Sequence, residues 1–209
     1  MIALWLTVAA AAASFGIGDA LVIRIAGQYG ADARARVLAW EALILNHANE
    51  PTHTKLELVN AFFNKLRFLD DIDHWGRRDY WATPVEFLST SGGDCEDFSI
   101  AKYFTLKELG VPVERLRLTY VKALELGQAH MVLAYYATPD AEPLILDNLV
   151  PSIEAGSSRT DLQPVYSFNG DGLWMAVARG RGRRVGTASR LNLWRDLTTR
   201  MEREDVWSS

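Results

Sequence analysis

Hydrophobic residues in the first half of the chain recur at helical spacing. In the segment 31–49, Val37, Trp40 and Ile44 are three or four positions apart, which places them on one face of a helix. The same spacing continues in "THTKLELVNAFFNKLRF", residues 52–68. We therefore expect two helices here, and we assign their apolar residues to packing.

Two later helices carry clearer start signals. In "TPVEFL", Thr83 is a candidate N-cap, Pro84 takes the first helical position and Glu86 is the reciprocal acid of a capping box. The second helix begins in "GGDCEDF" and stops at Gly110. Cys95 therefore lies in a first helical turn, where unpaired backbone N–H groups and the helix dipole favour a thiolate.

Beyond residue 115 the period of the pattern changes to two. "LRLTYVKAL", "HMVLAYYA" and "LILDNL" are expected to be strands and antiparallel neighbours. His130 starts the second strand and Asp147 lies within the third, so the two side chains can meet across one sheet face. A symmetric hairpin centred on Asp140 misaligns them by several residues, so the pairing requires a bulge or an asymmetric loop.

The order of these elements, with N-terminal helices and the Cys95 helix followed by antiparallel strands, indicates an α+β fold. A length of 209 residues, 49% hydrophobic and 23% charged, fits one globular domain with a full core.

The chain starts with an apolar run that ends in small residues, "MIALWLTVAAAAASFGIGDA". This composition is typical of the hydrophobic and cleavage regions of a secretory signal, although no Lys or Arg precedes it. An uncleaved membrane anchor and a buried N-terminal helix are the alternatives. We assign residues 1–25 to a signal or anchor segment and residues 26–209 to a single domain, and we expect export.

The overall charge bears on the class of partner. A net charge of -4 and a pI near 5.6 give no general attraction to nucleic acid or anionic lipid, so we expect no nucleic-acid partner. The basic stretch "RGRGRRVG", residues 179–186, is assigned to a solvated loop. The single cysteine excludes an internal disulfide.

A thiol, an imidazole and a carboxylate make up the candidate catalytic set: Cys95, His130 and Asp147. In acyl transfer by such a set, the imidazole takes the thiol proton and the acid fixes the imidazole tautomer. Each residue also has a structural interpretation, as a small buried side chain, a satisfied strand histidine and a turn cap. The backbone N–H of Cys95 is a candidate oxyanion donor, and Trp81 is a guess for a second one.

Three acids surround the candidate nucleophile, namely Asp94, Glu96 and Asp97. Negative charges disfavour a thiolate, so either something offsets these acids or Cys95 is only a packing residue. Glu96 and Asp97 also have a structural interpretation, since acids complement a helix N-terminus. A second acidic cluster, in "DDIDHWGRRDYW", fails the EF-hand spacing because Trp75 and Ala82 stand where ligands are required. We assign that cluster to a solvated turn, and the alternative is that it lends an oxygen to the Cys95 site in the fold; its acids are Asp70, Asp71, Asp73 and Asp79.

Much of the chain, from about residue 59 to about residue 174, resembles the bacterial transglutaminase-like cysteine proteinases. The resemblance rests on "VNAFFNKLRFLDDIDHWGRRDYWATPVEFL", "GGDCEDFSIAKYFTLKELGVP", "LRLTYVKA", "AHMVLAYY", "PLILDNL" and "PVYSFNGDGLW". It implies a papain-like or transglutaminase-like core, with the cysteine helix packed against an antiparallel sheet. It also implies Cys95 as nucleophile, His130 of "AHMVL" as general base and Asp147 of "LDN" as orienting acid.

The resemblance further implies a dependence on calcium, with Asp94, Glu96 and Asp97 among the ligands of the ion. Carboxylate oxygens suit Ca²⁺, and the ion would offset the charge that opposes a thiolate. The resemblance also implies a periplasmic endopeptidase that cuts the N-terminal region of a large surface adhesin and so releases cells from a biofilm. An inner-membrane cyclic di-GMP receptor that sequesters the protease is implied as a partner.

Two alternatives to the endopeptidase stay open at this point. A transglutaminase-type acyl transferase uses the same triad but passes the acyl group to an amine. A non-enzymatic calcium-dependent binding module would use the acids for ligation and would not need the thiol.

Overall fold

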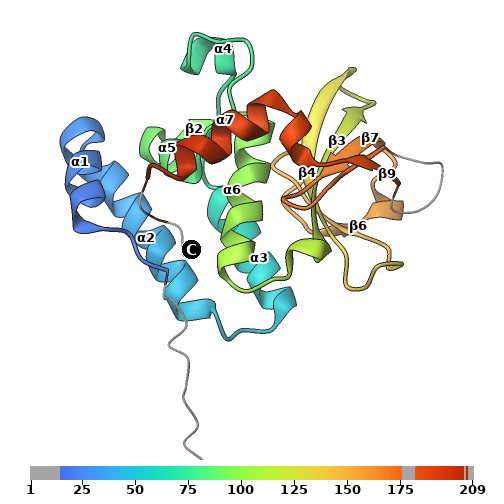
Figure 1. The fold of residues 1–209 in the computed structure, drawn as a ribbon, viewed down its shortest axis with the longest axis horizontal. Helices are drawn as coiled ribbons and strands as arrows, with labels where there is room; N and C mark the ends of the chain where they lie inside the picture. Colours follow the sequence, from blue (N-terminus) through green and yellow to red (C-terminus); the bar gives the residue numbers. More distant parts are fainter. Residues whose placement is uncertain (1–14, 176–181, 205, 207–209) are drawn as a thin grey trace, which may run out of the picture.

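The computed structural model describes residues 15–175, 182–204 and 206 of the chain. In these residues most helices gather on one side of the molecule and a sheet lies on the other, with α6 between them (Figure 1). The described α-helices are α1 (Asp19–Tyr29), α2 (Ala31–His47), α3 (Thr52–Phe63), α4 (Asp71–His74), α5 (Pro84–Thr90), α6 (Cys95–Glu108) and α7 (Asn192–Met201). Short 3-10 helices are η1 (Val113–Arg115), η2 (Gly156–Ser158) and η3 (Ala188–Arg190).

The main sheet has the strand order β6-β5-β4-β3-β7-β8-β9, and every neighbouring pair is antiparallel. Its strands are β3 (Leu116–Ala123), β4 (Gln128–Tyr135), β5 (Leu144–Leu146), β6 (Glu154–Ala155), β7 (Leu162–Phe168), β8 (Leu173–Met175) and β9 (Arg183–Gly186). A separate parallel pair joins β1 (Arg67–Phe68) to β2 (Gly92–Gly93). The three strands expected beyond residue 115 are confirmed as antiparallel neighbours.

The position of Asp147 differs from the prediction. β4 and β5 pair in a regular ladder from Leu133 opposite Leu146 to Tyr135 opposite Leu144, and this ladder contains no bulge. Asp147 follows the last residue of β5 instead of lying within it. Because the chain leaves the ladder there, its side chain reaches along the sheet to His130 without any shift of register.

Helix α6 is buried on all sides. Every residue from Glu96 to Leu106 is buried, because β3 and β4 cover one side of the helix while α3 and α5 pack against others. The ring of Phe104 stacks on Trp194 of α7 at 5.5 Å. The stretch from Glu96 to Leu106 has no solvent face, so a polar side chain on it has to find its partner inside the protein.

The N-terminal part of the described chain belongs to the packed domain. Phe15, Ile17 and three residues of α1 lie in the hydrophobic core, and the expected boundary between residues 25 and 26 falls inside α1. Burial of this apolar surface draws the segment onto α2 and α5. Residues 1–14, the larger part of the predicted signal or anchor, lie outside the described residues. Among the described helices, none combines the length and the apolar character that crossing a bilayer requires.

Candidate active site

Cys95 is the first residue of α6, as predicted. Asp94 is the N-cap, and its carboxylate accepts from the backbone N–H of Glu96 at 3.2 Å. The carboxylate of Asp97 returns the interaction by accepting from the N–H of Asp94 at 3.3 Å, which completes a capping box. The thiol therefore stands at the positive end of the helix dipole, and two of the three neighbouring acids also fix the helix start.

The glycine pair before Asp94 brings the backbone close to these acids. Gly92 and Gly93 form β2 against β1, and a Cβ on Gly93 would lie 2.1 Å from Oδ2 of Asp97. Glycine is required here for space, because no side chain fits between the strand and the helix start.

The thiol of Cys95 is held by an acid in this structure. Its Sγ donates to Oε2 of Glu96 at 2.7 Å, and the hydroxyl of Tyr120 donates to the other oxygen of the same carboxylate. Burial raises the pKa of the thiol far above its usual value, and the charges of Glu96 and Asp94 raise it further. The protein alone thus favours the protonated thiol, as the crowding of acids in the sequence predicts.

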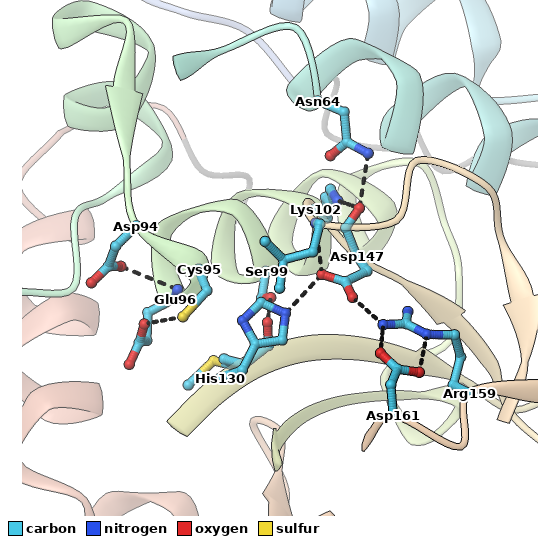
Figure 2. Close-up of polar contacts among 12 residues, drawn as sticks. Asn64, Asp94, Cys95, Glu96, Ser99, Lys102, His130, Asp147, Arg159 and Asp161 are labelled. Atoms are coloured by element: carbon cyan, nitrogen blue, oxygen red, sulfur yellow. Dashed lines mark hydrogen bonds and ion pairs between the residues drawn. The ribbon is translucent and has the colours of Figure 1, made fainter. Parts of the chain in front are cut away.

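His130 and Asp147 form a buried pair. Nε2 of His130 lies 2.8 Å from Oδ1 of Asp147, and the two residues are only 2% and 1% exposed. Burial alone raises the pKa of Asp147, but hydrogen bonds from His130, Leu149 and Arg159 outweigh it and bring the pKa to about 2. An ionised carboxylate only accepts, so Nε2 carries the hydrogen and Nδ1 is left as the basic nitrogen. In Figure 2 the imidazole lies between Asp147 and the Cys95 side chain.

Three donors that sequence reasoning missed converge on Asp147 (Figure 2). Nη2 of Arg159 lies 2.8 Å from Oδ2, while Asn64 and Lys102 donate to the backbone carbonyl at 2.8 and 3.1 Å. Arg159 is also paired with both oxygens of Asp161. Burial lowers the pKa of Lys102 to about 7, and the attraction of Asp147 opposes that shift.

One sequence signal pointed to part of this set. Cys95, Ser99 and Lys102 stand at positions i, i+4 and i+7 of the helix, so they share one face. Ser99 donates to the carbonyl of Met131, next to His130, and Lys102 to that of Asp147. A lysine on a buried helix face marks a partner inside the protein, although the sequence does not say which one.

A group of acids lies beside the thiol on the other side from His130 (Figure 2 shows Asp94 and Glu96). Carboxylate oxygens of Asp71, Asp94 and Asp97 lie within 4.8 Å of one another, and Asp94 also belongs to a second such group with Cys95 and Glu96. Burial raises the pKa of Asp94 to about 10, helped by Glu96, Asp97 and Asp71, and it raises that of Asp97 well above its usual value. These acids repel one another, and no cation of the described residues pairs with them.

Asp71 corrects the assignment of the second acidic cluster to a solvated turn. It is buried in α4, whereas Asp70, Asp73 and Asp79 are exposed. Its Oδ2 accepts from the backbone N–H of Tyr80, while its Oδ1 is buried without a hydrogen-bond partner. Burial raises the pKa of Asp71 to about 6, against the hydrogen bond from Tyr80. The structure thus brings Asp71 to the predicted ligands Asp94 and Asp97, and Glu96 turns to the thiol.

A cavity of about 320 Å³ is linked to Glu96 through Tyr120. Asp79, Trp81, Tyr120 and Tyr166 are among its lining residues, and Tyr120 is the residue that bonds Glu96. Trp81 is tied to the site through the next residue, since the N–H of Ala82 donates to Asp97 at 2.7 Å. The suggestion that Trp81 donates to an oxyanion stays a prediction.

Comparison with known proteins places this geometry in a family. The family model of the bacterial transglutaminase-like cysteine proteinases (BTLCP) matches residues 39–180. The chain belongs to this family. The matched region contains all the residues that the sequence proposes as catalytic set and metal ligands, so the predicted family membership is confirmed.

Solved structures agree with this membership. LapG of Legionella pneumophila is similar to the chain with a TM-score of 0.76 and 47% identity over 86% of this chain and 94% of that one. Its EGTA-treated form gives a TM-score of 0.78 at 46% identity, over 90% of this chain and 100% of the other. Its calcium-bound form gives 0.75 at 47%, over 86% and 97%. The transglutaminase-like α+β fold class is confirmed, and no curated protein sequence matches the chain.

Proposed function

We propose that the chain is a calcium-dependent cysteine endopeptidase with Cys95 as nucleophile, His130 as general base and Asp147 as orienting acid. The observation that carries the proposal is the buried bond between His130 and Asp147 near the start of the Cys95 helix, in a member of a cysteine proteinase family. Nucleophile, base and orienting acid in this order are the requirement of acyl transfer through a thioester.

The reaction follows from the roles of these three residues. Nδ1 of His130 takes the thiol proton while Sγ of Cys95 attacks the carbonyl carbon of the scissile peptide bond. When the tetrahedral adduct collapses, the C–N bond breaks and the imidazolium returns the proton to the leaving amine. A water molecule, deprotonated by His130, then attacks the thioester, and the thiol and a carboxylic acid are released.

The start of α6 supplies one donor for the oxyanion. Backbone N–H groups of a first helical turn have no helical acceptor, so the N–H of Cys95 is available to the carbonyl oxygen that the thiol attacks. Hydrogen bonds from His130, from the backbone N–H of Leu149 and from Arg159 keep Asp147 ionised, so the imidazole keeps one tautomer.

The acids beside Cys95 fit a calcium ion. Asp71, Asp94 and Asp97 would hold it, and the unpartnered buried Oδ1 of Asp71 is an oxygen that lacks a donor without it. Glu96, the third predicted ligand, would join them by exchanging its bonds to Cys95 and Tyr120 for the ion. Bound calcium supplies the positive charge that offsets these acids next to the thiol. LapG of Legionella pneumophila, which is similar to this chain, has a calcium-bound structure.

The proposal extends to the biological setting on the strength of family resemblance. We propose that the enzyme works in the periplasm, to which the apolar start of the chain, ahead of the packed residues, directs it. Its substrate is then the N-terminal region of a large surface adhesin, whose cleavage controls biofilm attachment, and an inner-membrane cyclic di-GMP receptor sequesters the enzyme.

The test is a cleavage assay on an adhesin fragment from the same genome. The purified chain is incubated with the fragment in calcium or EGTA, in H₂¹⁸O, and with a labelled primary amine. We expect cleavage in calcium only, one ¹⁸O in the new carboxyl terminus, and no product with Cys95→Ala. Incorporation of the amine in place of ¹⁸O would make the chain an acyl transferase, and tight binding without any product, unchanged in Cys95→Ala, would make it a binding module.

A further inference from the structure

The carboxylate of Asp147 is fixed at both oxygens. Oδ1 accepts from His130 and from the backbone N–H of Leu149, and Oδ2 accepts from Arg159. The other two donors, Asn64 and Lys102, bind its backbone carbonyl. Within the described residues, Arg159 is therefore the one side chain besides His130 that controls how the carboxylate is turned.

We propose that Arg159 is a positioning residue of the reaction, which fixes the Asp147 carboxylate so that Oδ1 faces Nε2 of His130. This inference rests on the proposed function. The guanidinium acts through Asp147 and does not touch the reacting atoms, so its effect passes to Cys95 only through the orientation and tautomer of the imidazole.

The surroundings of Arg159 suit this role. The side chain is 3% exposed and is held from its other side by Asp161, whose oxygens bind Nε at 2.9 Å and Nη2 at 2.7 Å. Nη2 thus bridges the two acids, and the planar fork leaves it little freedom. Without Arg159, the buried Oδ2 of Asp147 loses its donor, and the carboxylate either rotates or takes up a proton.

The first arm of the test is kinetic. In Arg159→Gln we expect kcat to fall about 10- to 100-fold, with a change in KM of less than about threefold, because substrate contacts are intact. Arg159→Lys keeps one charged donor and is expected to recover part of the loss. The matched control is Arg36→Gln, which removes an arginine that binds the carbonyls of Leu88 and Ser89 away from the triad, and it is expected to leave kcat unchanged.

The second arm reads the imidazole directly and does not need a substrate. The ¹⁵N chemical shifts of His130, assigned by comparison with His130→Gln, report the tautomer. We expect one tautomer, with the hydrogen on Nε2, in the wild-type chain and in Arg36→Gln, and a mixture in Arg159→Gln. Should Arg159→Gln not fold, Arg159→Lys carries both arms, with a smaller effect in the same direction.

The two arms separate the possible failures. An unchanged tautomer together with a kcat within about twofold of wild type overturns the role of Arg159, even if the chain is a peptidase. If no peptide is cleaved by the wild-type chain, the proposed function fails, while a change of tautomer in Arg159→Gln still shows that Arg159 positions the pair.

Discussion

Asp147 lies on one side of His130 and Cys95, and a group of acids lies on the other side. The two differ in whether the protein itself offsets their negative charge. Asp147 is compensated from within by His130, Arg159 and backbone N–H groups, and its pKa is about 2. In the described part of the chain, Asp71 and the half-buried Asp94 accept hydrogen bonds only from backbone N–H groups and lie among other acids, and their pKa values are about 6 and about 10. The charge of Asp147 is thus offset by the protein itself, whereas the charge of the acids beside Cys95 is offset only when a cation binds.

This difference separates two parts of one mechanism. The orientation of His130 needs no bound ion, because the Asp147 carboxylate that holds it is paired with the guanidinium of Arg159. A thiolate at Cys95, by contrast, is not stabilised by the protein alone, because burial and the neighbouring acids together favour the protonated thiol. We therefore expect the chain to be folded but inactive until a divalent ion binds.

The largest effect on activity is expected when Asp147 is changed. Asp147→Asn keeps the volume but allows the wrong imidazole tautomer, so kcat should fall about 10³- to 10⁴-fold. Calcium affinity, measured by titration calorimetry, should stay at the wild-type value, because Asp147 is not part of the acid group. A parallel loss of calcium binding would mean that Asp147 and the acid group are not independent.

The reverse pattern is expected for an acid of the cluster. Asp94→Asn removes one carboxylate from both groups near Cys95, and we expect calcium to bind about 10- to 100-fold more weakly. Activity should return at high calcium, since the His130 and Asp147 pair is unaffected. The two measurements are calcium affinity by calorimetry and activity at saturating calcium. A calcium affinity equal to that of the wild-type chain would show that Asp94 is not a calcium ligand.

A smaller effect is expected from the glycine that lies against the cluster. In Gly93→Ala the new Cβ would lie 2.1 Å from Oδ2 of Asp97, so the start of α6 has to shift, at a cost of about 1–3 kcal/mol. Thermal unfolding should show a lower Tm, and calcium affinity should fall. The control is Gly27→Ala in α1, where nothing lies within 4 Å of the new Cβ and a helical alanine stabilises by up to about 1 kcal/mol.

The smallest effect is expected in the pH dependence of stability in EGTA. Because the pKa of Asp71 is raised to about 6, its contribution to stability is present below its ordinary value of 3.8 and is lost as the pH rises through about 6. Asp147 has the opposite sign: its contribution is present above 3.8 and is lost as the pH falls through about 2. Asp71→Asn should therefore flatten the fall of Tm between about pH 4 and pH 6. An unchanged pH profile would contradict the burial of an uncompensated Asp71.

Local features of the fold were predictable because neighbouring residues determine them. The capping box of Thr83 and Glu86 and the Cys95 helix depend on residues within one turn, and both are confirmed. The strands were predicted from their alternating pattern. The offset between His130 and Asp147 was misjudged, since a side chain just past the end of a strand is not bound by the ladder register.

The parts of the site that were missed depend on contacts between distant segments. Asp71, the first residue of α4, lies beside Asp94 and Asp97 at the start of α6, and no local pattern distinguishes it from its exposed neighbours. Arg159 reaches Asp147 from the loop after η2, in a sequence that reads as an ordinary turn. In both cases burial decides the role, and burial is a property of the tertiary fold.

The most direct test of the account is the rate at which iodoacetamide alkylates the protein, which reports Cys95 alone because it is the single cysteine. The rate is measured near neutral pH in calcium and in EGTA, for the wild-type chain and for folded His130→Ala. We predict fast alkylation only in the wild-type chain with calcium, because a thiolate there needs both the cation and the base. A slow rate that responds neither to calcium nor to the loss of His130 would make Cys95 a structural residue and contradict the proposed mechanism.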